Sequence, residues 1–216
     1  TQNPCSGPQP SASGLIYIGQ GAVASFTPSN NSNSPIIACV NKPLILTNTS
    51  YSGLTIPTSG STCSSNASFY WTISPSTAGS WTATGLGSNN GDMNDVNNWT
   101  SGLNNPSINF NISGDYVITL RVKNSCGDSS ISQTFCVQPQ LSPAFNLSTT
   151  SGCAPLAVTT TNNTNLIGQC SAPTYEWTVG YVAGNCGASS GYSFTNATTA
   201  TSANPSFNFT QAGTYT

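Results

Sequence analysis

The sequence predicts an all-β chain of two consecutive β-sandwich units, stapled by disulfides. Three observations carry this prediction. Apolar residues alternate with polar ones, one stretch of the chain occurs twice, and 8 of the 216 residues are cysteine while none is histidine. Alternation is the period of a half-buried strand, and nowhere do apolar residues recur at helical spacing over two turns. The length fits two sandwiches of about 100 residues each.

The repeated stretch runs from 105 to 122 and returns, shortened, from 204 to 216. In the first copy an alternating run ends at Gly114, and a second run opens with Tyr116. This pattern predicts two strands around a tight corner. A tyrosine that opens the second strand fits the tyrosine corner of immunoglobulin-like sandwiches, where its hydroxyl caps nearby backbone.

The remaining elements divide the chain into four parts. We expect residues 1–34, the least periodic part, to be the tail of a preceding repeat or an N-terminal strand segment. A first sandwich is expected over 35–138 and a second over 144–216, shortened before its last strands. The segment 139–143 between them contains two prolines and is expected to be a semi-rigid linker.

The two units share their anchors in the same order. A strand after Cys39 matches one after Cys153, and each unit then has an aromatic strand with a central tryptophan. A buried tryptophan on the third strand is typical of the immunoglobulin fold. The spacing of matched anchors falls from 114 residues at the first cysteine to 99 at the proline that begins the repeated stretch after its asparagine, which indicates one fold with variable loops. The predicted core contains Trp71, Tyr116, Leu120, Trp177 and Tyr215.

Charge and cysteine usage exclude several classes of function. Three basic and five acidic residues give a net charge of −2. The chain therefore lacks the cluster of positive charge that binds nucleic acid or an anionic membrane. No run of 18 apolar residues is present, so we expect no membrane insertion. Without histidine, mixed Cys/His zinc sites are excluded, and eight cysteines predict disulfides and an extracellular or cell-surface location.

The disulfide prediction has three pairs. Cys39 precedes the second strand and Cys126 follows the strand that Tyr116 opens, so we expect these two to pair across the sandwich. Cys170 is expected to pair locally with Cys186, and Cys63 with Cys136.

Catalysis is disfavoured, because general acid–base chemistry needs a group that titrates near neutral pH. The chain has no histidine and only five carboxylates. We therefore predict that it is not an enzyme and needs no cofactor, with calcium as the one candidate. The loop with Asp92, Asn94, Asp95 and Asn97 either wraps a calcium ion with its oxygens or is a polar loop rich in Asx turns.

Two tryptophans outside the predicted core strands, Trp81 and Trp99, are candidates for a glycan-binding face. The alternative is that they cover the sandwich ends or pack between neighbouring domains.

The motifs together resemble the PKD domain, the polycystic-kidney-disease type of immunoglobulin-like repeat. They are a tryptophan on an early strand, Asn-Pro-Ser-x-x-Phe, and Gly-x-Tyr before an alternating strand and Asn-x-Cys-Gly. The Cys-Ala-Pro-Leu start of the second unit looks like the tandem PKD-like arrays of very large surface proteins of Bacteroidetes, including gliding-motility adhesins. The resemblance covers residues 35–216. The family's usual Trp-x-Phe-Gly-Asp-Gly is absent here, so no role of that acidic turn is carried over.

The resemblance and the composition lead to one functional hypothesis and one alternative. The first is a structural or adhesive protein, in which tandem units form a stalk, surface adhesin or filament. The alternative is a carbohydrate-binding accessory module of a secreted hydrolase. The expected partners are neighbouring repeats of the same chain, identical subunits or surface glycans. Because the second unit stops before a central strand, we expect a neighbour to complete it; the rival is a closed monomer in which Cys5 and Cys153 meet.

Overall fold

The computed structural model describes residues 16–29, 36–56, 65–89, 91, 98–182 and 189–216. These residues form an all-β fold of antiparallel sheets, as predicted. The chain divides into two compact units, one made of Thr1–Asn111 with Asp115–Cys136 and the other of Ile112–Gly114 with Val137–Thr216. Within the described ranges, no helix is long and apolar enough to cross a membrane.

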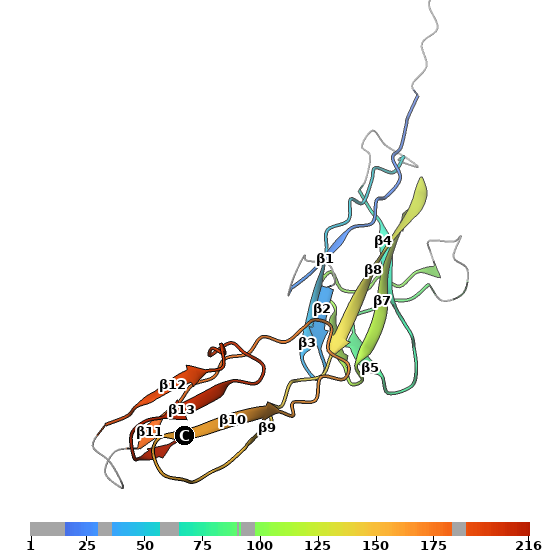
Figure 1. Cartoon of the computed structure of the whole chain (residues 1–216). Helices are drawn as coiled ribbons and strands as arrows, with labels where there is room; N and C mark the ends of the chain where they lie inside the picture. Colours follow the sequence, from blue (N-terminus) through green and yellow to red (C-terminus); the bar gives the residue numbers. More distant parts are fainter. Residues whose placement is uncertain (1–15, 30–35, 57–64, 90, 92–97, 183–188) are drawn as a thin grey trace, which may run out of the picture. The chain divides into compact units, whose positions relative to one another are not determined.

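The first unit contains two four-stranded sheets, in the orders β1-β3-β6-β5 and β2-β8-β7-β4 (Figure 1). These orders correspond to the ABED and GFC sheets of an immunoglobulin-like sandwich, with β2 added beside the G strand. The strand order therefore assigns the fold. The strands are β1 (Phe26–Pro28), β2 (Ile36–Cys39), β3 (Pro43–Asn48), β4 (Ser68–Ser74), β5 (Trp81–Thr84), β6 (Ser107–Phe110), β7 (Gly114–Asn124) and β8 (Gly127–Gln138).

The core of the first unit is built around the tryptophan of β4. Trp71 is 2% exposed, its ring meets Phe26 edge to face at 5.1 Å, and its Nε1 donates to the carbonyl of Leu103 at 3.2 Å. Tyr116 and Leu120 of β7 are also buried. The alternation of β7 explains this, because every second residue points into the space between the two sheets. Other apolar side chains of β3, β6, β7 and β8 that are at most 1% exposed include Leu46, Ile108, Phe110, Ile118, Val122, Phe135 and Val137.

The first unit begins earlier than the sequence predicted. Strand β1 lies inside the stretch 1–34, and Phe26 pairs with Asn48 of β3. A buried polar contact holds the residues before β1, because Asn124 donates from Nδ2 to the carbonyls of Gln20 at 2.8 Å and Ser52 at 2.9 Å. Residues 20–28 thus pack with the strands of the first sandwich, whereas the sequence analysis began that unit at residue 35.

The second unit repeats one sheet of the first, in the order β12-β13-β10-β9 (Figure 1). This is the ABED sheet read from its D strand. A second, two-stranded sheet pairs β11 with β14. The strands are β9 (Phe145–Leu147), β10 (Leu156–Asn162), β11 (Tyr181–Val182), β12 (Tyr192–Thr195), β13 (Ser206–Phe209) and β14 (Thr214–Tyr215).

Matched hydrogen bonds show that the two units share one register. The amide of Leu46 donates to the carbonyl of Pro106 at 3.2 Å, and the amide of Thr160 donates to that of Pro205 at 3.1 Å. Leu46 and Thr160 are 114 residues apart and the prolines 99, the same spacings that the cysteine and proline anchors have in the sequence. The offsets read from the sequence therefore correspond to equivalent positions in two copies of one sandwich.

The tyrosine corner is formed in the second unit. The hydroxyl of Tyr215 donates to the carbonyl of Gln211 at 3.0 Å and accepts the amide of Gly191 at 3.0 Å. Of the five predicted core residues, the second unit's Trp177 and Tyr215 are only half-buried. The residues around Trp177 are not part of a strand ladder, so this core is open where that of the first unit is closed.

This difference predicts unequal costs for matched substitutions. We expect Trp71→Ala to lower the stability of the first unit by about 3–5 kcal/mol, because it empties a closed core. Trp177→Ala, its counterpart, should cost about 1–2 kcal/mol, because part of that ring already faces solvent. Hydrogen–deuterium exchange of peptides from each unit, read in increasing urea, measures both. Equal losses of stability for the two substitutions would contradict the conclusion that the core of the second unit is open.

A candidate binding groove in the second unit

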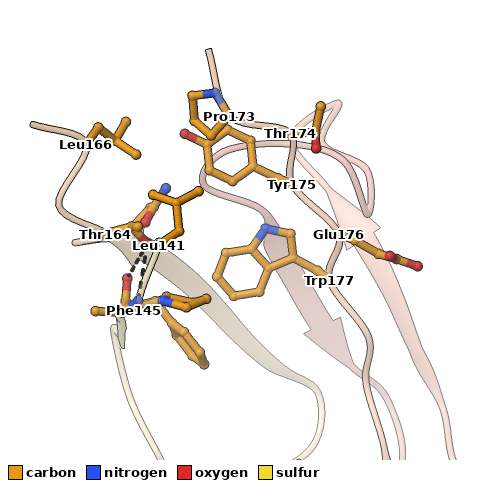
Figure 2. Close-up of a pocket in the computed structure, with 12 residues that line it drawn as sticks. Leu141, Phe145, Thr164, Leu166, Pro173, Thr174, Tyr175, Glu176 and Trp177 are labelled. Atoms are coloured by element: carbon orange, nitrogen blue, oxygen red, sulfur yellow. Dashed lines mark hydrogen bonds between the residues drawn. The ribbon is translucent and has the colours of Figure 1, made fainter. Parts of the chain in front are cut away.

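A groove of about 190 Å³ lies on the second unit, where the segment that contains Trp177 approaches β9. Its walls come from the segment before β9, the end of β10 with the turn after it, and the segment 173–177 (Figure 2). The residues that line it are Leu141, Pro143, Ala144, Phe145, Asn162, Thr164, Leu166, Pro173, Thr174, Tyr175, Glu176 and Trp177.

Aromatic rings form the floor of the groove. The rings of Trp177 and Phe145 meet edge to face, with centroids 4.9 Å apart. Trp177 is fixed by two hydrogen bonds, from its Nε1 to the carbonyl of Ser202 at 2.9 Å and from its amide to the carbonyl of Ala200 at 2.9 Å. Figure 2 shows the indole directed toward Phe145 and Leu141, with Tyr175 on the same side of the strand.

The same aromatic pair exists in the first unit, where it is covered. Phe26 is 2% exposed, whereas its counterpart Phe145 is 52% exposed. In the first unit Leu120 of β7 lies opposite Trp71 in the ladder, and Leu120 and Phe135 of β8 are fully buried. Within the described residues of the second unit no strand occupies these two places. Among the described residues, the floor of the groove therefore corresponds to the closed core of the first unit.

Short polar contacts hold the wall beside β9. The amide of Ala144 donates to Oγ1 of Thr164 at 3.2 Å, and the amide of Thr164 donates to Oδ1 of Asn162 at 2.9 Å, an Asx turn. The first unit makes the same contacts, where the amides of Ser25 and Ser50 have these two roles. The wall is thus a fixed feature of the fold, and the groove exists before any ligand enters.

The chemistry of the groove is that of a binding surface. Glu176 is its one carboxylate, and Figure 2 shows this side chain on the opposite side of the strand from Trp177. Among the described residues, no three His, Cys, Asp or Glu side chains are grouped so that they could hold a metal ion. Half-exposed aromatic rings beside a wall of backbone and hydroxyl groups favour an apolar or mixed ligand.

The structure describes the two tryptophans of the predicted glycan-binding face but not the residues of the predicted calcium loop. Asp92, Asn94, Asp95 and Asn97 lie outside the described residues. The structure does not bring the two candidate tryptophans together: Trp99 packs on the outer face of β4 and is 6% exposed, and Trp81 is half-buried on β5. Tyr70 meets the Trp99 ring edge to face at 4.8 Å. Trp99 therefore covers a sheet and offers no open ring face to a sugar.

The predicted pairing of Cys39 with Cys126 is wrong, because both are free thiols. The turn after Cys39 is hydrogen-bonded to Phe110, which lies just before the start of β7. Cys126 comes after the end of β7, so the two cysteines lie near opposite ends of this strand. A strand of 11 residues spans about 35 Å. The Cα atoms of a disulfide lie within about 7 Å of each other, so the pair cannot form.

The other two predicted pairs are corrected as well. Cys136 and Cys170 form a disulfide with each other, so neither is available to its predicted partner. Cys63 and Cys186, those partners, lie outside the described residues, as does Cys5. Cys153, which the rival hypothesis paired with Cys5, is a free and exposed thiol.

Sequence reasoning singled out Trp177, as a core residue, and missed Phe145 and Leu141. The signal for Phe145 was present: Phe26 precedes it by 119 residues, and the serine three residues after each phenylalanine bonds to the next strand in the same way. That serine is Ser29 in the first unit and Ser148 in the second. Matching the two units from residue 26 would have placed Phe145 beside Trp177.

Comparison with known proteins adds little to this description. No protein-family model matches the chain, and no curated protein matches its sequence. Among solved structures, the chain is similar to a chimeric titin Z1Z2 carrying an exogenous KLER peptide from decorin. The identity is 8%, the match covers 92% of this chain and 89% of that one, and the TM-score is 0.32. At that score the likeness carries no argument, and the fold assignment rests on the strand orders.

The cysteine assignments predict the outcome of thiol mapping. Without reductant, we expect a peptide pair that links Cys136 to Cys170, and rapid native alkylation of Cys126 and Cys153, which are exposed. Cys39 is half-buried and should react more slowly. Mass spectrometry of digests with and without reduction measures this. A peptide pair that links Cys39 to Cys126 would overturn the assignment.

Proposed function

We propose that this chain is a structural and adhesive part of an extracellular protein, in which immunoglobulin-like units form a stalk, surface adhesin or filament. The observation that carries the proposal is the repetition of one sheet, in the same order and register, in two consecutive units. Repeated sandwiches provide length and a surface for attachment. Repetition of this kind does not bring titratable side chains together in one catalytic site. We infer that the protein works without catalytic turnover.

Composition and covalent chemistry support this role. Only 4% of the residues are charged, so salt has few ion pairs to weaken. An ion pair joins Arg121 to Asp128 at 2.6 Å, and the hydrogen bond that Arg121 donates to the Asp128 carboxylate is the main cause that raises the pKa of Arg121. The disulfide between Cys136 and Cys170 fits an oxidising, extracellular setting.

The alternative, a carbohydrate-binding accessory module, has less support. Trp81 keeps part of its ring in solvent, but its Nε1 donates to the carbonyl of Pro75 at 2.9 Å, and Trp99 is buried. The two candidate tryptophans therefore do not offer a pair of open ring faces. We therefore favour neighbouring repeats or identical subunits as partners over surface glycans.

The proposal predicts that adhesion depends on folded units. In the source organism, Trp71→Ala in the full-length protein should reduce attachment of cells to a surface by more than half, because the first unit would unfold. Trp71→Phe keeps an aromatic ring in the core and is the matched control, with attachment near the unsubstituted level. Surface display is measured in parallel with an antibody to another region.

Two results would contradict the proposal. One is unchanged attachment by cells that display the Trp71→Ala protein. The other is an antibody signal confined to the cell interior for the unsubstituted protein.

A further inference from the structure

One disulfide closes a long loop of the chain. Cys136, two residues before the end of β8, is bonded to Cys170, and the 33 residues 137–169 lie between them. The loop contains β9, β10 and the two-proline segment before β9. The chain therefore has two covalent routes from Cys136 to Cys170, one through two sulfur atoms and one through the loop.

The two routes differ greatly in length. The Cα atoms that a disulfide joins lie within about 7 Å of each other. The 33 residues of the loop can extend to about 110–120 Å. Because tension straightens the shorter route first, the disulfide becomes taut while the loop is still slack.

Hydrogen bonds close the two ends of the loop beside the disulfide. The amide of Cys170 donates to Oε1 of Gln138 at 3.1 Å, and Nε2 of Gln169 donates to the carbonyl of Pro139 at 3.0 Å. The folded chain thus holds the ends of the loop together in two ways. Pulling breaks the hydrogen bonds between these segments, whereas the covalent bond between the same segments persists.

The loop encloses a complete strand pair. Strands β9 and β10 pair antiparallel over three residue pairs, one of which places Phe145 opposite Asn162. The amide of Asn163 donates to the carbonyl of Ala144 at 2.8 Å and extends this ladder. Since both partners of each bond lie between the two cysteines, tension that passes through the disulfide does not act on this ladder.

The strands that follow Cys170 bear the tension instead. Strand β13 pairs with β10 over four residue pairs and with β12 over four others. Its ladder with β12 lies wholly after Cys170, whereas its ladder with β10 joins a loaded strand to the shielded loop. Pulling therefore detaches β13 from β10, while β10 stays in a slack loop that is tied to Cys170.

We propose that the Cys136–Cys170 disulfide is a bypass for tension, which carries a pulling force past residues 137–169 so that β9 and β10 bear no load. The bypass limits how far the chain lengthens when the second unit unfolds. The 33 residues of the loop become extensible only when the disulfide is cleaved. This inference rests on the proposed function and deepens it, because a stalk, surface adhesin or filament carries tension along its chain.

The test pulls the whole chain of 216 residues by its two ends in single-molecule force spectroscopy, without reductant. The fully extended chain should be shorter by about 110–120 Å than a chain with Cys136→Ser and Cys170→Ser, because the variant adds the loop to its length. The matched control carries Cys39→Ser and Cys126→Ser, which remove two free thiols. It should extend to the length of the unsubstituted chain.

A second measurement does not depend on whether the doubly substituted chain folds. The unsubstituted chain is first unfolded at constant force, and dithiothreitol is then added. One further elongation of about 110–120 Å should follow, which the chain with Cys136→Ser and Cys170→Ser lacks. In this step the bond between the two sulfur atoms breaks, two cysteine thiols form, and the dithiol reagent is oxidised to its cyclic disulfide.

Two outcomes would overturn the inference. One is an unsubstituted chain that extends, without reductant, to the same length as the chain with Cys136→Ser and Cys170→Ser. The other is the absence of the additional elongation when dithiothreitol is added. Either outcome would leave the cell-attachment experiment on Trp71 unaffected, so the two proposals are judged separately.

Discussion

The packing of one tryptophan against the opposite sheet is the interaction on which both units depend. In each, the indole meets a phenylalanine of the A strand edge to face, Trp71 with Phe26 and Trp177 with Phe145, at 5.1 and 4.9 Å. Each indole Nε1 also bonds to a loop carbonyl, so the ring has one orientation. A chain with few charges has little else to specify how two sheets face each other, so a large apolar ring with one polar atom sets the alignment.

The difference between the units shows what the F and G strands contribute. With β7 and β8 in place, Trp71 is 2% exposed, and Leu120 and Phe135 are fully buried. Where no such strands are described, the same aromatic pair forms the floor of a groove, and Phe145 is 52% exposed. The same aromatic pair is thus closed over in the first unit and more exposed among the described residues of the second. The polar wall beside it is unchanged, because Asx turns and hydroxyl contacts are local.

The sequence alone determined the strand class, the duplication and its offsets, because alternation and anchor spacing are local properties. It placed Trp71, Tyr116 and Leu120, whose neighbours in the chain carry the same pattern. Disulfide partners and the true start of the first unit required the tertiary structure. Cys39 and Cys126 lie at opposite ends of β7, and Phe26 joins the sandwich by pairing with Asn48, contacts that no spacing encodes. The half-exposed state of Trp177 was also decided there, because burial depends on which strands lie over a residue and not on the residue itself.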